Sequence, residues 1–455
     1  MRSLFRKITY AAAIAALILG ASAFALAEEE TEYVVKYRPE SGIASDEVYD
    51  LVTEEELAEL IEADAVEIYE ENMTVELFDA EYTYSSTYKW DLDMINADIA
   101  YEMGACGDGL TIGIIDSGLN RNHPAFAGAS ILPGHNYMNG TSNTSDSIGH
   151  GTFVAGMICA QPNSYGIIGV APRASVVPLK CFDQEDGTVQ QISNAIRGAV
   201  DTYHCDILNL SFGMFSSSKA MKDAIDYAAG KGVIIVASAG NYADEEGSIG
   251  TRLLYPAAYD NVIGVGAVDS DGSWAEFSQH NRSVFLSAPG KGVRSTSYDG
   301  GYKAWSGTSF SSPLTAGAIA DILSLRGIMT FDALCALLRE TVVDRGAEGW
   351  DEYYGYGTLD LGAALEFELT GVYCSDGEMR FAYYNDTDED FSAVLFAASY
   401  VNGRFITAAA IPFTVQAQNI RTAALPEMFG TETRLMLCLS GELTPVLQPF
   451  VLQRE

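Results

Sequence analysis

The segment LTIGIIDSGLN, residues 110–120, decides how the middle of this chain folds. Its first seven residues form an apolar run typical of a buried strand. The pattern changes to that of a helix in HGTFVAGMICA, residues 150–160, and returns to a strand in ASVVPLK, residues 174–180. Continuous apolar strands followed by helices are typical of a parallel sheet that is covered on both faces.

The same alternation continues along the chain, with further helical and strand patterns at 189–203, 206–212, 218–232 and 233–240. We therefore expect an α/β fold, a mostly parallel sheet with helices on both faces, over about residues 90–367. In such sheets, binding and catalytic sites form where strands end and helices begin.

Two smaller units flank this region. Before it, strand patterns at 32–38, 65–69 and 73–78 and a helical face over 47–62 predict a small α+β unit. After it, short alternating runs separated by turn residues predict a β-sandwich. The expected division is a signal peptide at 1–27, the α+β unit at 28–82, the α/β domain at 83–367 and the β-sandwich at 368–455.

The first 27 residues have the pattern of a secretory signal. Arg2, Arg6 and Lys7 precede the apolar run 8–20, and ALA at 25–27 fits a cleavage site. The alternative is a membrane anchor, but the run is short for a span and no second candidate follows. We expect a secreted, extracellular protein without a stable membrane span.

The formal net charge of the 455 residues is −36, which makes nucleic acid and anionic membrane surfaces poor partners. Seven cysteines leave at least one thiol unpaired. Most of them lie in apolar runs, where the role of a small buried side chain is favoured. A disulfide between Cys374 and Cys438 is the alternative for that pair.

Three motifs together predict nucleophilic catalysis. Asp116 ends the strand in IIDSGLN, His150 begins a helix in GHGTFVAG, and Ser309 lies at a helix start in SGTSFSSP. A serine hydroxyl must lose its proton to attack a carbonyl, and an imidazole can accept that proton and pass it to the leaving amine. A carboxylate orients the imidazole and stabilises its cation, and the order Asp, His, Ser is a recurrent one.

The surroundings of these residues fit the same chemistry. Gly149, Gly151 and Gly307 allow the backbone to pass close to the reacting centre. Asn241, after the strand VIIVASAG, would donate the side-chain N–H of an oxyanion hole.

These motifs, with YPAAYDNVIGVGAVDSDG and the stretch from FSQHN to the serine motif, resemble the subtilisin-like serine proteases, the subtilases, over about residues 85–365. The resemblance implies an endopeptidase that hydrolyses protein or peptide substrates through an acyl-enzyme and needs no cofactor for the chemistry. The unit at 28–82 resembles the family's propeptide, a partner that covers the groove and is cut off within residues 79–89.

The resemblance also implies the substrate groove. A bound peptide would pair with two backbone segments and insert its P1 side chain into an apolar pocket. The groove residues are Ser211, Phe212, Gly213, Asp186 and Gly187, and the pocket residues are Ser238, Ala239, Gly240 and Leu254. Leu254 and Met214 replace smaller residues of the family, which favours small or medium apolar P1 side chains. The acidic run 244–246 leaves open a preference for basic ones.

A structural Ca²⁺ site is a further implication of the resemblance. Its residues would be Gln161, Asn163, Tyr165 and Ile167, but Ala125 stands where the family has an aspartate. Calcium prefers several oxygen ligands that include carboxylate. The alternative is a packed loop without metal.

Two other functions stay open at this point. One is a peptide ligase or macrocyclase on the same fold, which needs an amine rather than water to attack the acyl-enzyme. The other is a non-catalytic peptide-binding surface protein, which would have no need to keep Asp116, His150, Ser309 and Asn241 together.

Overall fold

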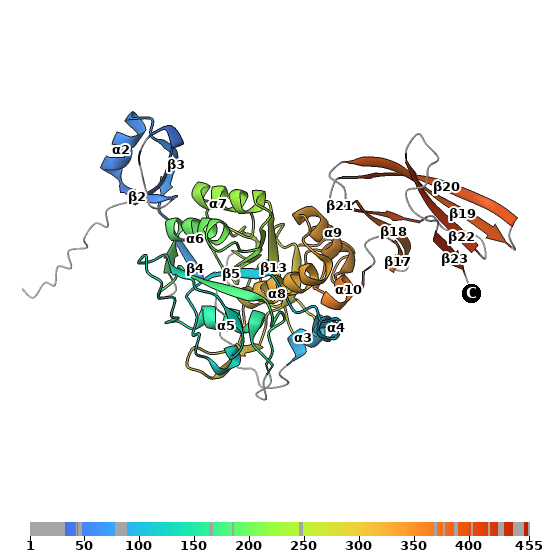
Figure 1. Ribbon diagram of the computed structural model, residues 1–455, viewed down its shortest axis with the longest axis horizontal. Coiled ribbons are helices and arrows are strands. Elements are labelled where there is room, and N and C mark those ends of the chain that lie inside the picture. Colours follow the sequence, from blue (N-terminus) through green and yellow to red (C-terminus); the bar gives the residue numbers. More distant parts are fainter. Residues whose placement is uncertain are drawn as a thin grey trace, which may run out of the picture.

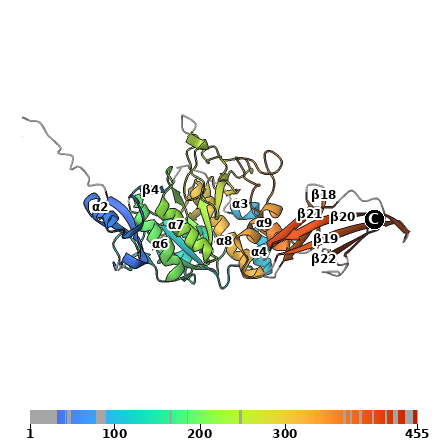
Figure 2. The ribbon, with the colours of Figure 1, turned by 90° about the horizontal axis from the view of Figure 1, so that it is seen from above.

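The chain forms three units that follow one another along the long axis of the molecule (Figures 1 and 2). The α/β unit lies in the middle, the small N-terminal unit at one end and the C-terminal β unit at the other. The computed structural model describes residues 32–41, 43, 48–77, 89–162, 167–183, 186–244, 249–367, 371–375, 378–385, 390–401, 404–416, 419–425, 432–439 and 450–453.

The middle unit is built on a parallel sheet of eight strands. The strand order is β14-β13-β12-β10-β5-β8-β6, with β7 also paired to β8. The strands are β5 (Thr111–Asp116), β6 (Ser130–Ile131), β7 (His135–Asn136), β8 (Ser175–Lys180), β10 (Ile207–Leu210), β12 (Ile234–Ser238), β13 (Val262–Val268) and β14 (Leu286–Pro289). The expected α/β fold class is confirmed.

Helices cover both faces of this sheet, and the side chains of its central strands divide between them. In β12, Ile234 and Val236 belong to the same buried cluster as α5 and α8, whereas Ile235 and Ala237 belong to that of α6 and α7. This two-sided burial explains the continuous apolar runs in the sequence. The four helices are α5 (His150–Cys159), α6 (Val189–Asp201), α7 (Lys219–Gly230) and α8 (Thr308–Arg326).

The remaining elements of this unit pack around its periphery. They are α3 (Trp90–Met94), α4 (Ala97–Met103), α9 (Phe331–Thr341), α10 (Leu361–Glu366), the antiparallel pair β15 (Val293–Thr296) and β16 (Tyr302–Trp305), and the short turns η2 (Pro124–Phe126) and η3 (Ile249–Thr251). No helix of the described residues combines the length and the hydropathy of a membrane-spanning segment.

The N-terminal unit consists of the antiparallel sheet β2-β1-β3, the turn η1 (Pro39–Ser41) and one helix. Its elements are β1 (Glu32–Tyr37), β2 (Asp50–Thr53), α2 (Glu54–Glu62) and β3 (Val66–Glu71). The predicted helix over 47–62 was too long, because residues 50–53 pair with β1 as a strand. Thr53 then caps α2 in a reciprocal capping box with Glu56, which fixes where the helix begins.

A fourth strand of the N-terminal segment joins the middle unit instead. Strand β4 (Thr74–Leu77) lies between β9 (Asp186–Thr188) and β11 (Phe212–Gly213) in a separate three-stranded sheet. Both pairings are antiparallel.

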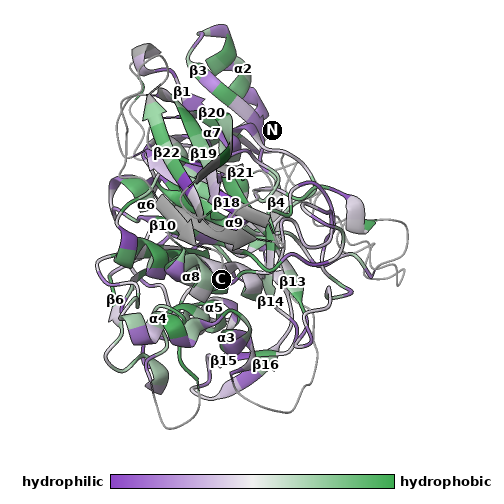
Figure 3. Cartoon of the chain, turned by 90° about the vertical axis from the view of Figure 1, so that its right-hand side faces the viewer, coloured by the Kyte–Doolittle hydropathy of each residue, from purple (hydrophilic) through white to green (hydrophobic). Residues whose placement is uncertain are grey.

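The C-terminal unit contains two antiparallel sheets, β17-β18-β21 and β20-β19-β22-β23. Hydrophobic residues, green in Figure 3, run along these strands among hydrophilic ones. Phe381 of the first sheet packs with Leu395 and Phe413 of the second, as in the predicted sandwich. The strands are β17 (Gly371–Ser375), β18 (Glu378–Asn385), β19 (Phe391–Val401), β20 (Arg404–Val415), β21 (Asn419–Ala424), β22 (Glu432–Leu439) and β23 (Phe450–Gln453). Cys438 on β22 is a buried free thiol, so the alternative disulfide with Cys374 was wrong.

Candidate active site

The predicted acid and base meet at the carboxyl end of the central sheet. Asp116 is the last residue of β5, and His150 is the first residue of α5. The Nδ1 atom of His150 lies 2.8 Å from Oδ1 and 2.9 Å from Oδ2 of Asp116. Both side chains are fully buried. A carboxylate in this position favours the tautomer that carries its proton on Nδ1.

Asp146, which the sequence analysis missed, holds the segment that leads to His150. Its carboxylate accepts hydrogen bonds from Ser117 Oγ (2.9 Å), Gly149 N (2.8 Å) and both Thr152 N (2.9 Å) and Thr152 Oγ1 (2.5 Å). Ser117 Oγ in addition accepts from the backbone N–H of Gly151. This carboxylate therefore joins the end of β5 to the start of α5. An aspartate among Asn, Ser and Thr just before a helix was the available signal.

Two glycines allow the helix start to approach β5 as closely as it does. A Cβ atom on Gly151 would lie 2.2 Å from the carbonyl oxygen of Gly118 and 3.0 Å from Oδ1 of Asp116. Gly149 has φ of 102°, a backbone conformation that side chains disfavour. The predicted need for glycine thus follows at position 151 from the contacts with Gly118 and Asp116, and at position 149 from the positive φ and the close approach of the Tyr298 ring.

Ser309 is the second residue of α8 and lies beside the same strand ends. Its Oγ donates to the carbonyl oxygen of Ser211 at 3.3 Å, and Ser211 Oγ donates to the carbonyl oxygen of Ser309 at 2.8 Å. The ring of Phe310, the next residue, lies 5.6 Å from the imidazole of His150 between centroids. Ser309 is fully buried. The three predicted side chains therefore gather at one edge of the sheet.

Asn241 is held next to the start of α8 with its amide nitrogen unused. Its Oδ1 accepts from both the backbone N–H (2.9 Å) and the hydroxyl (2.8 Å) of Thr308. Its Nδ2 is buried and, among the described residues, has no hydrogen-bond partner. A buried N–H without a partner costs free energy, so such groups are rare in folded proteins. This donor is available to an oxygen atom that enters beside Ser309.

The two backbone segments predicted to bind substrate already hold a strand, β4 of the same chain. Val75 pairs with Gly187 and Glu76 with Asp186 on one side. Glu76 pairs with Gly213 and Leu77 with Phe212 on the other. The side chains of β4 are outside the description, but the backbone register is defined. These two segments are therefore already paired with a strand in the full chain.

Three of the predicted pocket residues, Ser238, Ala239 and Gly240, lie at the end of β12. Ser238 closes β12, and a Cβ atom on Gly240 would lie 3.1 Å from both methyl carbons of Leu254. Met214 exchanges two backbone hydrogen bonds with Tyr255, each 2.9 Å long. Leu254 and Met214, the two departures from the family pattern, thus lie on neighbouring segments of the chain.

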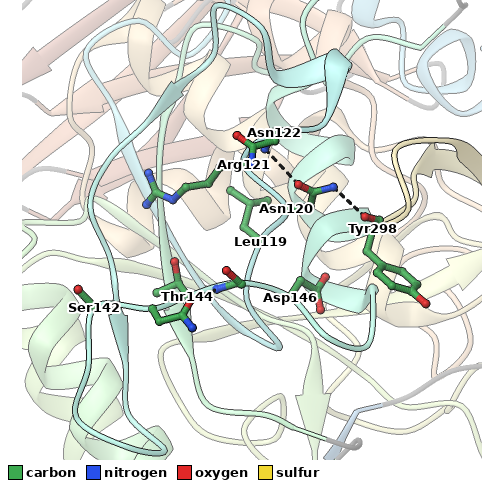
Figure 4. Close-up of a pocket in the computed structure, with 10 residues that line it drawn as sticks. Leu119, Asn120, Arg121, Asn122, Ser142, Thr144, Asp146 and Tyr298 are labelled. Carbon is green, nitrogen blue, oxygen red and sulfur yellow. Dashed lines mark hydrogen bonds between the residues drawn. The ribbon is translucent and has the colours of Figure 1, made fainter.

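A surface pocket of about 400 Å³ lies beside the segment that Asp146 holds (Figure 4). Its wall is mainly polar, and the amide of Asn120 donates to the carbonyl oxygen of Tyr298 across it at 2.7 Å. The lining residues are Leu119, Asn120, Arg121, Asn122, Ser142, Asn143, Thr144, Ser145, Asp146 and Tyr298.

The described side chains of the predicted calcium loop contact the protein itself. The amide nitrogen of Gln161 donates to the carbonyl oxygens of Cys159 and Pro172. Ala125 and Ile167 pack with Ala160 in an apolar cluster. Asn163 and Tyr165 lie outside the described residues. Among those that are described, no group of three His, Cys, Asp or Glu could hold a metal.

Comparison with known proteins shows which family this chain resembles. A model of the subtilase family matches residues 107–357, more than half of the chain. Subtilisin DY of Bacillus licheniformis is 36% identical over 285 residues, which cover 62% of this chain and 100% of that protein. The thermostable alkaline protease of Halalkalibacterium halodurans is 31% identical over 369 residues, 77% of this chain and 96% of that protein. Subtilisin E of Bacillus subtilis is 35% identical over 291 residues, 63% of this chain and 73% of that protein.

These relatives define the class of the protein, a hydrolase of the serine-type endopeptidases. The chain belongs to the subtilase family.

Proposed function

We propose that this protein is a secreted endopeptidase that is made as an inactive precursor and processes itself through Asp116, His150 and Ser309. The observation that carries the proposal is β4, a strand of the chain's own N-terminal segment that occupies the groove between β9 and β11. A substrate strand would bind by the same backbone pairing once β4 has left.

The proposed reaction follows from the contacts at the sheet edge. Ser309 Oγ attacks the substrate carbonyl carbon and passes its proton to His150 Nε2, while Asp116 stabilises the imidazolium through Nδ1. The oxyanion accepts a hydrogen bond from the otherwise unpartnered Nδ2 of Asn241. His150 returns the proton to the leaving amine, and water then hydrolyses the acyl-enzyme by the reverse proton transfers.

The register of β4 favours one processing bond. Glu76 pairs with Gly213 and Leu77 with Phe212, so the next position on the β11 side is Ser211, whose carbonyl oxygen lies beside Ser309. The next residue in the chain after Leu77 is Phe78, and we infer that the bond after Phe78 is cut. This bond directly precedes the predicted interval 79–89, and residues 78–88 lie outside the described part of the chain.

The same register also predicts which P1 residues a substrate can have. The proposed P1 pocket, with Ala239, Gly240 and Leu254 in its wall, is apolar, which favours apolar P1 residues over charged ones. Processing after Phe78 would mean that the pocket admits an aromatic side chain, which is larger than the sequence analysis predicted. Peptides that differ only at P1, with Ala, Leu, Phe, Lys or Glu, will rank these preferences by kcat/KM.

Labelling with a fluorophosphonate probe tests the nucleophile. We expect the label on the peptide that contains Ser309, and no label in Ser309→Ala. Ser311→Ala is the matched control, because Ser311 lies in the same helical turn but donates to the carbonyl oxygens of Ala288 and Pro289. Labelling of another serine, or unchanged activity in Ser309→Ala, would refute the proposal.

Product masses distinguish hydrolysis from ligation. A peptidase yields two fragments whose masses sum to the substrate plus one water, whereas a ligase joins a fragment to an added amine. Family membership favours hydrolysis, and neither ligation nor non-catalytic binding has a supporting observation. Export is supported by the signal pattern at 1–27, and the chain's presence in culture medium without that segment tests it.

A further inference from the structure

The β15–β16 hairpin lies against the helix that begins with His150. It forms a sheet of its own, separate from the groove sheet β11-β4-β9, and β15 packs on α5 (Figure 3). Trp305 is the last residue of β16, and its ring centroid lies 6.1 Å from that of the His150 imidazole. Trp305 is therefore a wall beside the imidazole that, in the proposed reaction, gives a proton to the leaving amine.

Lys303 places a positive charge on this wall. It lies two residues before Trp305 on the same strand, so both side chains point to the same face of β16. Its Nζ atom lies 2.9 Å from the centroid of the Trp305 ring, where an ammonium is attracted by the indole. Ser295, which pairs with Lys303 across the hairpin, donates its hydroxyl to the carbonyl oxygen of Phe153 in α5. This face of the hairpin is therefore turned toward α5 and His150.

The charge of the hairpin differs in sign from that of the chain. Residues 293–305 contain Arg294 and Lys303 but a single carboxylate, Asp299, in a protein with a formal net charge of −36. Asp299 is exposed in the turn of the hairpin. Arg294 pairs with Ala304 and so belongs to the opposite face. The ammonium of Lys303 is thus the charge that the hairpin carries on the side of α5.

The chain's own processing sequence is acidic on the leaving side of the proposed bond. That bond follows Phe78, and the next three residues are Asp79, Ala80 and Glu81. A carboxylate at the first position after the cut bond, P1′, complements an ammonium in the wall beside it.

We propose that Lys303, held above Trp305, makes the enzyme select an acidic residue, Asp or Glu, at P1′. A substrate strand in the position of β4 leaves the groove sheet at Ser309, so its residues after the cut bond lie on the side of His150 and Trp305. The inference rests on the proposed function and narrows its substrates to peptides with an apolar residue before the cut bond and a carboxylate after it.

Peptides with one fixed acyl part, Thr-Val-Glu-Leu-Phe, and Asp, Asn or Lys at P1′ test this selection. Asp and Asn have the same size, so the ratio of their kcat/KM values isolates the effect of the charge. We expect the wild-type enzyme to prefer Asp about two- to fivefold at low salt and less as salt is added, because the charges are partly exposed. Product masses identify the bond that is cut.

The variants at Lys303 separate charge from structure. Lys303→Gln should remove the preference, Lys303→Glu should reverse it in favour of Lys, and Lys303→Arg should keep it. Lys222→Gln is the matched control, because Lys222 lies on α7, which covers the opposite face of the sheet from α5. The same acyl part linked to p-nitroaniline has no P1′ residue, so wild type and Lys303→Gln should hydrolyse it equally. A purely structural effect of the substitution would lower that rate as well.

An Asp to Asn ratio that is the same in the wild type and Lys303→Gln would overturn the inference, as would a wild-type ratio of one. Either result would leave the proposed function standing, because cleavage still occurs. Failure to cleave any of these substrates, the p-nitroanilide included, would refute the proposed function and the inference with it.

Discussion

At the scale of single residues, the active site depends on side chains that hold the proposed catalytic side chains in position. Asp116 and His150 were predictable because each lies in a motif whose chemistry needs that residue type. Asp146 was not predicted, since its role arises only when the turn before α5 folds back and its carboxylate accepts several donors at once. The bonds from Gly149 and Thr152 are local in the sequence, and the residue types before α5 were a signal for them, whereas the bond from Ser117 depends on tertiary placement, which a local pattern does not contain.

Removing the proposed nucleophile or oxyanion donor should reduce turnover by very different factors. We expect a loss of about 10⁶-fold in kcat for Ser309→Ala and about 10²–10³-fold for Asn241→Ala, magnitudes taken from subtilisin itself rather than derived from this structure. Steady-state kinetics on one peptide substrate measures both. An Asn241→Ala enzyme with unchanged kcat would contradict the oxyanion role.

Asp146→Asn should lower kcat without a comparable change in KM. The amide keeps the size of the carboxylate but places an NH₂ group where donors now point at an oxygen, so the start of α5 shifts relative to Asp116. We expect a loss of roughly tenfold or more, since small misplacements of catalytic groups are costly. Asp299→Asn, on an exposed turn, is the control. Equal kcat values in the two variants would show that Asp146 does not position His150.

At the scale of elements, helix α8 combines burial with polar residues along its length. Ser309, Ser311 and Ser312 are buried at its start, where the active-site edge and neighbouring strands supply partners. Asp321 is buried further along, and neither carboxylate oxygen has a hydrogen-bond partner among the described residues. Burial raises the pKa of Asp321 well above its ordinary range, and the charge of Asp108 adds to the rise.

Replacing Asp321 by leucine should therefore stabilise the protein. A carboxyl group with a raised pKa in the folded state binds its proton more tightly there than in the unfolded chain, so stability falls as the pH rises above about 4. We expect a higher Tm for Asp321→Leu at pH 8 and a smaller difference at pH 4. A gain of about 1 kcal/mol shifts Tm by roughly 2–4 °C in a domain of this size.

Asp226→Asn on the exposed surface of α7 is the control for this change, and calorimetry at both pH values provides the measurement. A lower Tm for Asp321→Leu at pH 8 would mean that a partner stabilises the carboxylate, which contradicts its burial as a lone acid.

The element scale also shows what sequence patterns can predict. The alternation of strands and helices in the middle unit was predictable, because strands buried on both faces are continuous in their hydrophobicity. The helix at 47–62 was predicted too long, because Val48, Leu51 and Val52 also fit helical spacing over so short a run. Only the pairing with β1 shows that residues 50–53 form a strand. The P1 pocket and the calcium loop stay predictions.

At the scale of the whole molecule, the two flanking units pack on opposite ends of the α/β unit (Figure 1). The C-terminal unit packs against it through α9 and Ile420, which is 7% exposed and belongs to the main core cluster. Arg380 lies 3.8 Å from Glu340 at this contact. The β unit is thus fixed to the side away from the N-terminal unit.

Ile420→Ala should weaken this packing. We expect a loss of about 2–5 kcal/mol, the range for truncating a buried isoleucine. Ile406→Ala is the matched control, because Ile406 lies on the same unit but is 51% exposed. Differential scanning calorimetry should show a lower transition temperature for Ile420→Ala alone. Identical transitions in the two variants would contradict the packing of the units.

The most direct test of the central claim is N-terminal sequencing of the mature wild-type protein beside Ser309→Ala. If Ser309 cuts the strand that occupies its own groove, the wild-type chain begins at Asp79 and Ser309→Ala keeps the residues before it. The same mature N-terminus in Ser309→Ala, produced without any other protease, would contradict the account.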